Sequence, residues 1–136
     1  MKKGFTLIEL LIVMVLFGTL VTIALPKYQR ALERGRALEG LRNVQYAAEY
    51  ANAKYIATGE YPASLPSTDQ IKNRFFSAPS IDQTNGNVTI IRTSSWGYKF
   101  TASNDGEGSL SSITCANTGS EDVCTQLDLI GNLLNN

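Results

Sequence analysis

The chain has 136 residues, in which 12 Lys and Arg balance 12 Asp and Glu, and it contains no histidine. The length predicts one folded domain. Zero net charge argues against a dedicated nucleic-acid binder, because phosphate binding needs a basic face. Without histidine there is no Ser-His or Cys-His nucleophile pair, and no phosphate-binding glycine loop or cysteine metal cluster is present. We therefore expect a protein that is not an enzyme and that uses no cofactor or metal.

The first predicted element is an apolar segment, residues 5–25, in which Glu9 is the only charged residue. As a helix it spans about 32 Å, the thickness of a bilayer's hydrocarbon core. Its threonines are tolerated because their hydroxyls bond carbonyls one turn back, and Pro26 closes the segment. A cleaved secretory signal would be shorter and would end in a small-x-small site. A plain membrane anchor explains the length but not Glu9, since a carboxylate costs about 3 kcal/mol at the bilayer centre.

The second predicted element is an amphipathic helix over residues 27–58 that continues the first. Its apolar face is predicted from residues spaced by three and four: Leu32, Gly35, Leu38, Leu41, Val44, Ala48, Ala51 and Tyr55. The remaining, solvent-facing side is assigned to Arg30, Glu33, Arg34, Arg36 and Arg42. Gly59 and Pro62 mark its end. The combined helix would be about 80 Å long. No domain of this size covers such a helix, so lipid or other subunits must bury its first half.

The C-terminal half, from Gly59 onward, is rich in Ser, Thr, Asn, Gly and Pro. A long connection with a short helix near residues 70–75 leads to strands predicted within 86–95, 96–103 and 108–115. Tyr98, Phe100 and Ala102 alternate with polar residues, which indicates a sheet with one buried face. The stretch "NDGEG" at residues 104–108 predicts a hairpin turn rather than a calcium loop. The fold class is therefore α+β, with an antiparallel sheet packed on the C-terminal half of the helix.

The two cysteines, Cys115 and Cys124, are separated by a polar stretch. The membrane-length segment favours an oxidising compartment, in which they would form a disulfide that closes a small loop. Two free thiols in a cytosolic protein are the alternative. The acidic pair Glu121 and Asp122 inside this loop is interpreted as a solvated face.

The string "KKGFTLIELLIVMVLFGTLVTIALPKYQRA" resembles the class III signal of type IV pilins and of the related pseudopilins of type II secretion. The resemblance rests on a basic leader that ends at Gly4, on Phe5, on Glu9 four residues later, and on the apolar run to Pro26. It covers the first 35 residues closely. The family layout of long helix, variable loop, antiparallel sheet and disulfide-closed C-terminal region matches the rest.

The resemblance implies that a prepilin peptidase cuts between Gly4 and Phe5 and that Phe5 is then N-methylated. It implies a leader (1–4), a transmembrane and filament-core helix (5–26), its amphipathic half (27–58), and a C-terminal region (59–136). The subunit would cross the inner membrane once, with its C-terminus in the periplasm, and the pilus assembly machinery would then build it into an extracellular homo-oligomeric helical filament.

Within such a filament, Glu9 is expected to pair with the Phe5 ammonium of a neighbouring subunit and so to fix the axial register. A glutamate that merely lies at the headgroup level is the alternative. The segment from Gly18 to Pro26 is expected to lose helical hydrogen bonds in the filament, with a simple kink at Pro26 as the alternative. Two other functions remain open: a type II secretion pseudopilin, and a minor pilin that binds DNA through residues 59–86 or 30–42.

Overall fold

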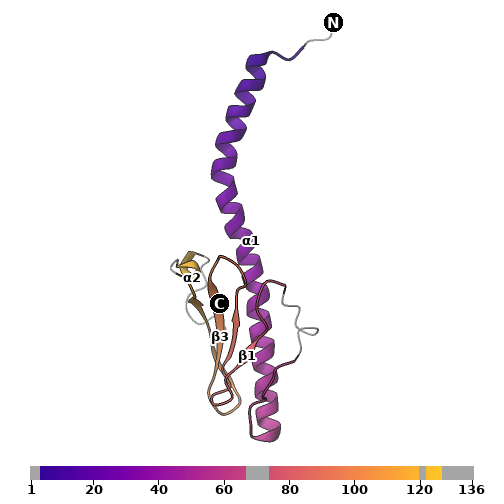
Figure 1. The fold of residues 1–136 in the computed structure, drawn as a ribbon, viewed down its shortest axis with the longest axis vertical. Helices are drawn as coiled ribbons and strands as arrows, with labels where there is room; N and C mark the ends of the chain where they lie inside the picture. Colours follow the sequence, from indigo (N-terminus) through magenta and orange to yellow (C-terminus); the bar gives the residue numbers. More distant parts are fainter. Residues whose placement is uncertain (1–3, 67–73, 120–121, 127–136) are drawn as a thin grey trace. The chain divides into compact units, whose positions relative to one another are not determined.

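The computed structural model describes residues 4–66, 74–119 and 122–126. It divides into two compact units, Met1–Arg34 and Gly35–Asn136. Helix α1 (Leu7–Thr58) begins in the first unit and ends in the second (Figure 1). It ends where the sequence predicts, because Gly59 adopts a φ of 79° and donates its N–H to the Tyr55 carbonyl at 2.7 Å. It begins at Leu7, two residues later than predicted.

A four-stranded antiparallel sheet with the order β1-β2-β3-β4 forms the rest of the second unit. Its strands are β1 (Ser80–Ile81), β2 (Val88–Ile91), β3 (Tyr98–Asn104) and β4 (Leu110–Asn117), followed by the short helix α2 (Val123–Gln126). The predicted α+β class and its three long strands are confirmed. The two-residue β1 was not predicted. Of the short helix expected near 70–75, residues 70–73 lie outside the described residues, and Arg74 and Phe75 are not helical.

The core lies between the sheet and the second half of α1, which run side by side in Figure 1. Tyr98, Phe100 and Ala102 of β3 are fully buried, as their alternation predicts. The rings of Tyr98 and Phe100 are 5.6 Å apart, and both contact Phe76 at centroid distances of 5.9 and 6.0 Å. This aromatic triad fixes the sheet against the helix, since edge-to-face pairs add to the area that they bury.

The buried face of α1 differs from the prediction between Leu32 and Gly40. The buried positions from Ala37 to Ala51 are small residues: Ala37, Gly40, Val44, Ala47, Ala48 and Ala51. Leu32 and Leu38 are instead 42% and 52% exposed, and Gly35 is exposed, whereas Glu33, assigned to the solvent side, is fully buried. The physical reason is Phe76, whose ring lies directly over Gly40 and leaves no room there for a leucine. The smallest residues therefore face the sheet.

The β3–β4 hairpin turn is confirmed. The Asp105 carboxylate accepts hydrogen bonds from the backbone amides of Glu107 (2.8 Å) and Ser109 (2.9 Å), and Gly106 and Gly108 have positive φ angles. Donation from Ser109 and Glu107 holds the pKa of Asp105 below its usual value. The acid at this position therefore shapes the turn.

Candidate assembly segment and disulfide-closed region

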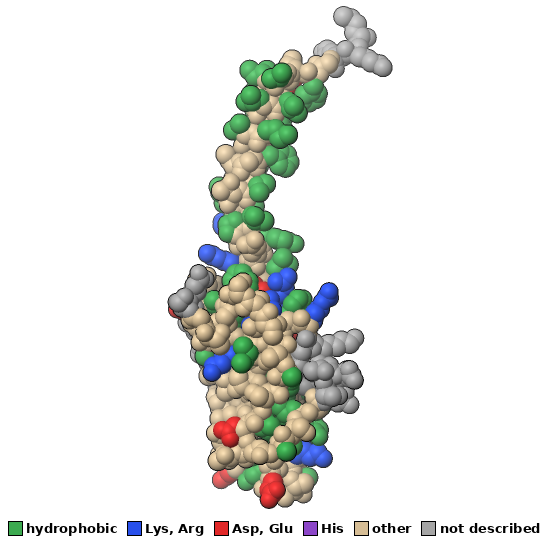
Figure 2. Space-filling view, in the orientation of Figure 1, with side chains coloured by type: hydrophobic (Ala, Val, Ile, Leu, Met, Phe, Trp, Pro, Cys, Tyr) green, Lys and Arg blue, Asp and Glu red, His purple; other side chains and the backbone are tan. Residues whose placement is uncertain are grey.

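The N-terminal half of α1 has an exposed apolar surface. Large apolar side chains between Phe5 and Leu25 range from 45% exposed at Val13 to 83% at Phe5. They cover this part of the chain in the space-filling view (Figure 2). By length and composition, α1 contains a stretch that could cross a membrane. Exposed apolar patches of this extent mark surfaces that bind lipid or protein.

Glu9 closes a capping box at the start of α1. The N–H and the hydroxyl of Thr6 donate to Glu9 Oε2 at 2.9 and 2.8 Å, and the N–H of Glu9 donates back to Thr6 Oγ1 at 3.4 Å. This Thr-x-x-Glu arrangement is a recognised helix start, which explains why α1 begins at Leu7. It also places the carboxylate at the positive end of the helix dipole. The capping role of Thr6 was not predicted, although the Thr-x-x-Glu spacing before an apolar run was the available signal.

The predicted processing site, Gly4 and Phe5, lies just before this cap. Neither residue is helical, and both are exposed. A side chain at Gly4 would meet nothing within 4 Å. Access to this peptide bond is therefore open in the chain, while cleavage and methylation there remain predictions.

The segment from Gly18 to Pro26 is helical in this chain, with Pro26 inside α1. Two threonines return their hydroxyls to the backbone as predicted: Thr19 to the Leu16 carbonyl at 2.9 Å, and Thr22 to the Gly18 carbonyl at 2.8 Å. Pro26 has no N–H to donate to the preceding turn. This stretch thus combines a flexible glycine, a hydroxyl that shares the Gly18 carbonyl and a missing backbone donor. Its loss of helical structure in a filament remains a prediction.

Cys115 and Cys124 form the predicted disulfide, with their Cα atoms 5.9 Å apart. It ties β4 to α2, whose Val123 and Cys124 are 2% and 3% exposed. Asn117 reinforces the link, because its Oδ1 accepts from the N–H of Cys124 at 3.0 Å. Closing a loop of this size stabilises the fold by about 2–3 kcal/mol in the chain-entropy account.

Asp122 caps the N-terminus of α2 and is more than the solvated charge that was predicted. Its carboxylate accepts from the Thr125 hydroxyl at 2.6 Å, the Asn117 amide at 2.9 Å and the Thr125 N–H at 3.3 Å. These donors, the Thr125 hydroxyl first, hold the pKa of Asp122 below its usual value. Its predicted partner in the acidic pair, Glu121, lies outside the described residues.

Comparison with known proteins agrees with this arrangement. Residues 1–25 match the family model for the prokaryotic N-terminal methylation motif. The chain is 34% identical over 100 residues to a fimbrial protein of Neisseria meningitidis serogroup A and 32% identical over 100 residues to the type IV major pilin protein PilE of Neisseria gonorrhoeae. Each alignment covers 70% of this chain, and the chain spans only 58% and 59% of those two relatives.

A third relative is covered almost completely. The chain is 30% identical over 112 residues to the type IV narrow pilus major component PilA5 of Thermus thermophilus, an alignment that covers 77% of this chain and 90% of the relative. The match therefore extends well beyond the 25 residues of the methylation motif. The chain belongs to the type IV pilin family.

Proposed function

We propose that the chain is the major structural subunit of a type IV pilus, with a mechanical rather than a catalytic role. The observation that carries this proposal is the surface of α1 between Phe5 and Leu25, where the large apolar side chains are about half exposed or more. At about 25 cal/mol per Å² of apolar surface, such a helix is strongly driven to leave water. A bilayer covers this apolar surface before assembly, and the helices of neighbouring subunits cover it in a filament. The relatives named as pilus components support the second environment.

Processing between Gly4 and Phe5 is part of this proposal. The match to the methylation motif supports it, as does the open, non-helical backbone at the site. Cleavage removes residues 1–4 but leaves the Thr6 N–H in place, so the capping box with Glu9 survives it. The new feature after cleavage is the ammonium group of Phe5.

Glu9 is suited to bind this ammonium on a neighbouring subunit. Its Oε2 is engaged by Thr6, whereas its Oε1 accepts no hydrogen bond from any residue that the structure describes. A carboxylate and an ammonium that meet in an apolar core neutralise each other, and a neighbour in the wrong register leaves both charges buried and unpaired. The local bonds to Thr6 and the helix dipole lower the cost of holding the carboxylate near the membrane before assembly. In the alternative, in which Glu9 merely lies at the level of the lipid headgroups, Oε1 needs no partner on another subunit.

For localisation, we propose the inner membrane before assembly, with the second unit in the periplasm, and the extracellular pilus afterwards. The membrane-length stretch in α1 supports the first location. The disulfide supports an oxidising compartment for the second unit. Prepilin peptidase and the pilus assembly machinery are the partners that this route requires.

The relatives' names favour a pilin over a pseudopilin of type II secretion. No specific observation on the described residues favours the DNA-binding alternative.

The test is deletion of the gene in its host, followed by complementation and electron microscopy of sheared surface material. Filaments that vanish on deletion, return on complementation and consist mainly of this chain support a major subunit. Filaments of unchanged number and composition after deletion overturn the proposal.

A further inference from the structure

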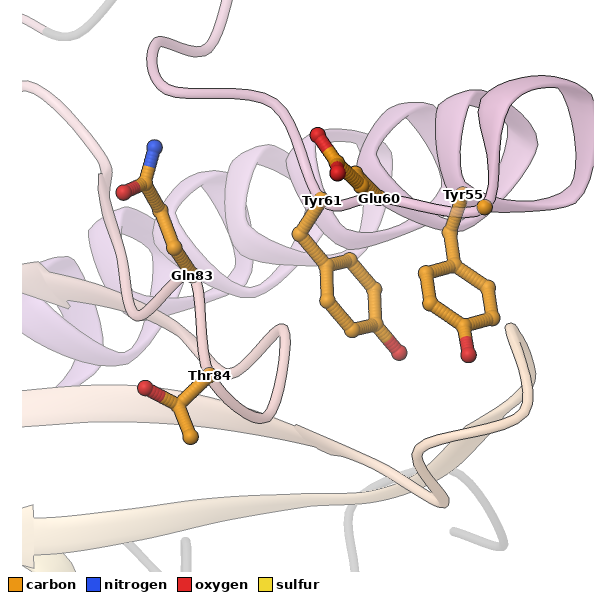
Figure 3. Close-up of a pocket in the computed structure, with 6 residues that line it drawn as sticks. Tyr55, Glu60, Tyr61, Gln83 and Thr84 are labelled. Carbon is orange, nitrogen blue, oxygen red and sulfur yellow. The ribbon is translucent and has the colours of Figure 1, made fainter.

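A pocket with no assigned role lies at the C-terminal end of α1 (Figure 3). It has a volume of about 350 Å³ and is lined by Tyr55, Gly59, Glu60, Tyr61, Gln83 and Thr84. These residues come from the last turn of α1, the segment that follows it, and the β1–β2 turn. The volume falls at the lower end of the range for sites that bind small groups.

The pocket combines aromatic surface with polar groups. The rings of Tyr55 and Tyr61 stack at a centroid distance of 4.5 Å and an interplanar angle of 22°. In Figure 3 the two hydroxyls point the same way, the Glu60 carboxylate lies near the backbone end of Tyr61 and points away from them, and Gln83 lies on the far side of Tyr61 from Tyr55. Tyr61 is only 8% exposed because its ring covers Gly86. The stack therefore forms an aromatic wall, and Glu60 is the one charged residue among the described residues that line the pocket.

Among the described residues, acidic side chains outnumber basic ones at this end of the second unit, with Glu60, Asp105 and Glu107 against Lys54. The backbone carbonyls of the last turn of α1 point here, and that turn carries no basic residue to offset the helix dipole. Lys54, one residue before that turn, directs its ammonium back over the Tyr50 ring at 5.9 Å from the ring centroid. The β3–β4 hairpin adds Asp105, which lies close enough to Tyr61 to help burial raise the pKa of that phenol. A negative potential with aromatic surface is the environment that favours an organic cation.

Basic residues lie at the other end of the second unit. Arg36, Arg74 and Arg92 all approach the Phe75 ring, at 4.9, 5.7 and 5.4 Å from its centroid. Twenty residues of α1, about 30 Å, separate Arg36 from Ile56, which lies beside the acidic hairpin. In Figure 2, Asp and Glu lie at the lower end of the visible face, where a Lys or Arg side chain lies as well. The clustered arginines thus lie away from the acidic hairpin.

We propose that the pocket at the end of α1 binds an arginine guanidinium of a second copy of this chain, supplied by the stretch from Arg30 to Arg42. This inference rests on the proposed filament function and deepens it. Arg30 and Arg42 are exposed, and no interaction engages either guanidinium among the residues that the structure describes. Glu60 accepts the guanidinium N–H groups, and the tyrosine wall and the helix carbonyls stabilise the cation further. A head-to-tail contact that does not close into a ring propagates along a filament.

The test compares filaments of the full chain carrying Glu60→Gln or Glu60→Arg with wild type. The matched control is Glu107→Gln, since Glu107 is an exposed acid at the same end that does not line the pocket. We expect about tenfold fewer surface filaments for Glu60→Gln, a larger loss for Glu60→Arg, and no change for Glu107→Gln. Unchanged thermal unfolding of the purified subunits will show that the loss is one of assembly.

Charge exchange identifies the partner. Adding Arg42→Glu or Arg30→Glu to the Glu60→Arg variant is expected to restore filaments, because the ion pair is rebuilt with reversed sign. Failure of both second-site changes, or equal filament numbers for Glu60→Gln and wild type, overturns this inference while leaving the pilus function intact. An absence of filaments from the wild-type chain refutes the proposed function itself.

Discussion

Two glycines of α1 are expected to respond in opposite ways to the same substitution. A helical Gly→Ala change gains about 0.5–1 kcal/mol, because alanine loses less backbone entropy on folding. At Gly35, an added Cβ meets nothing within 4 Å, so Gly35→Ala should keep the whole gain. At Gly40, the added Cβ collides with the Phe76 ring. That ring is 4% exposed and packs against Tyr98 and Phe100, so it has little room to move.

The overpacking penalty decides the sign at Gly40. Forcing a methyl group into a filled core costs about 1–3 kcal/mol, which exceeds the helix-propensity gain. We therefore expect Gly40→Ala to be about 1 kcal/mol less stable than wild type and about 2 kcal/mol less stable than Gly35→Ala. For a unit of roughly 100 residues, 1 kcal/mol lowers Tm by about 4–8 °C.

The assay is thermal unfolding of the full chain in detergent. Near-UV circular dichroism monitors the transition, because this signal reports on the aromatic core. A second variant, Gly40→Ala with Phe76→Leu, should recover part of the lost stability relative to Phe76→Leu alone, since the smaller side chain removes the collision. If Gly40→Ala is as stable as Gly35→Ala, then Phe76 does not pack on the helix as described.

Three further changes test other parts of the structure. Replacing Cys115 and Cys124 by serine should lower the free energy of unfolding by about 2–3 kcal/mol, and a reductant should lower the Tm of wild type but not of this variant; equal Tm values without reductant would contradict the disulfide's role. The lowered pKa values of Asp105 and Asp122 mean that their contribution to stability is present above the unfolded pKa of about 3.9 and is lost as the pH falls through the folded value. Asp105→Asn and Asp122→Asn should each flatten the acid limb of a stability-against-pH curve, and an unchanged slope would refute the assigned hydrogen bonds. Glu9→Gln keeps the capping box but removes the charge, so it should leave membrane insertion intact and sharply reduce filament number, whereas normal filaments would favour the headgroup alternative.

Local patterns in the sequence predicted most of the fold. The end of α1 at Thr58, the alternation in β3 and the β3–β4 turn each depend on neighbouring residues, so a short stretch contains the whole signal. The resemblance in the first 35 residues likewise predicted the processing site and a role for Glu9, and both roles remain proposals.

The features that were missed depend on contacts between distant segments. The buried face of α1 was misassigned because Phe76, which lies 36 positions beyond Gly40 in the sequence, decides which helix residues fit against the sheet. The pocket at the end of α1 is built from two segments whose proximity follows from the packing of Tyr61 on Gly86. Strand β1 has only two residues, too few to show a period. Thr6 was a different case, since its spacing to Glu9 was visible and its capping role was overlooked.

The central claim is that this chain is cut between Gly4 and Phe5 and assembled through α1 into a pilus. Mass spectrometry of the subunit from purified sheared filaments tests it most directly. The account predicts that the subunit begins with an N-methylated Phe5 and carries the Cys115–Cys124 disulfide. Filament subunits that begin at Met1, or filaments that lack this chain, would contradict it.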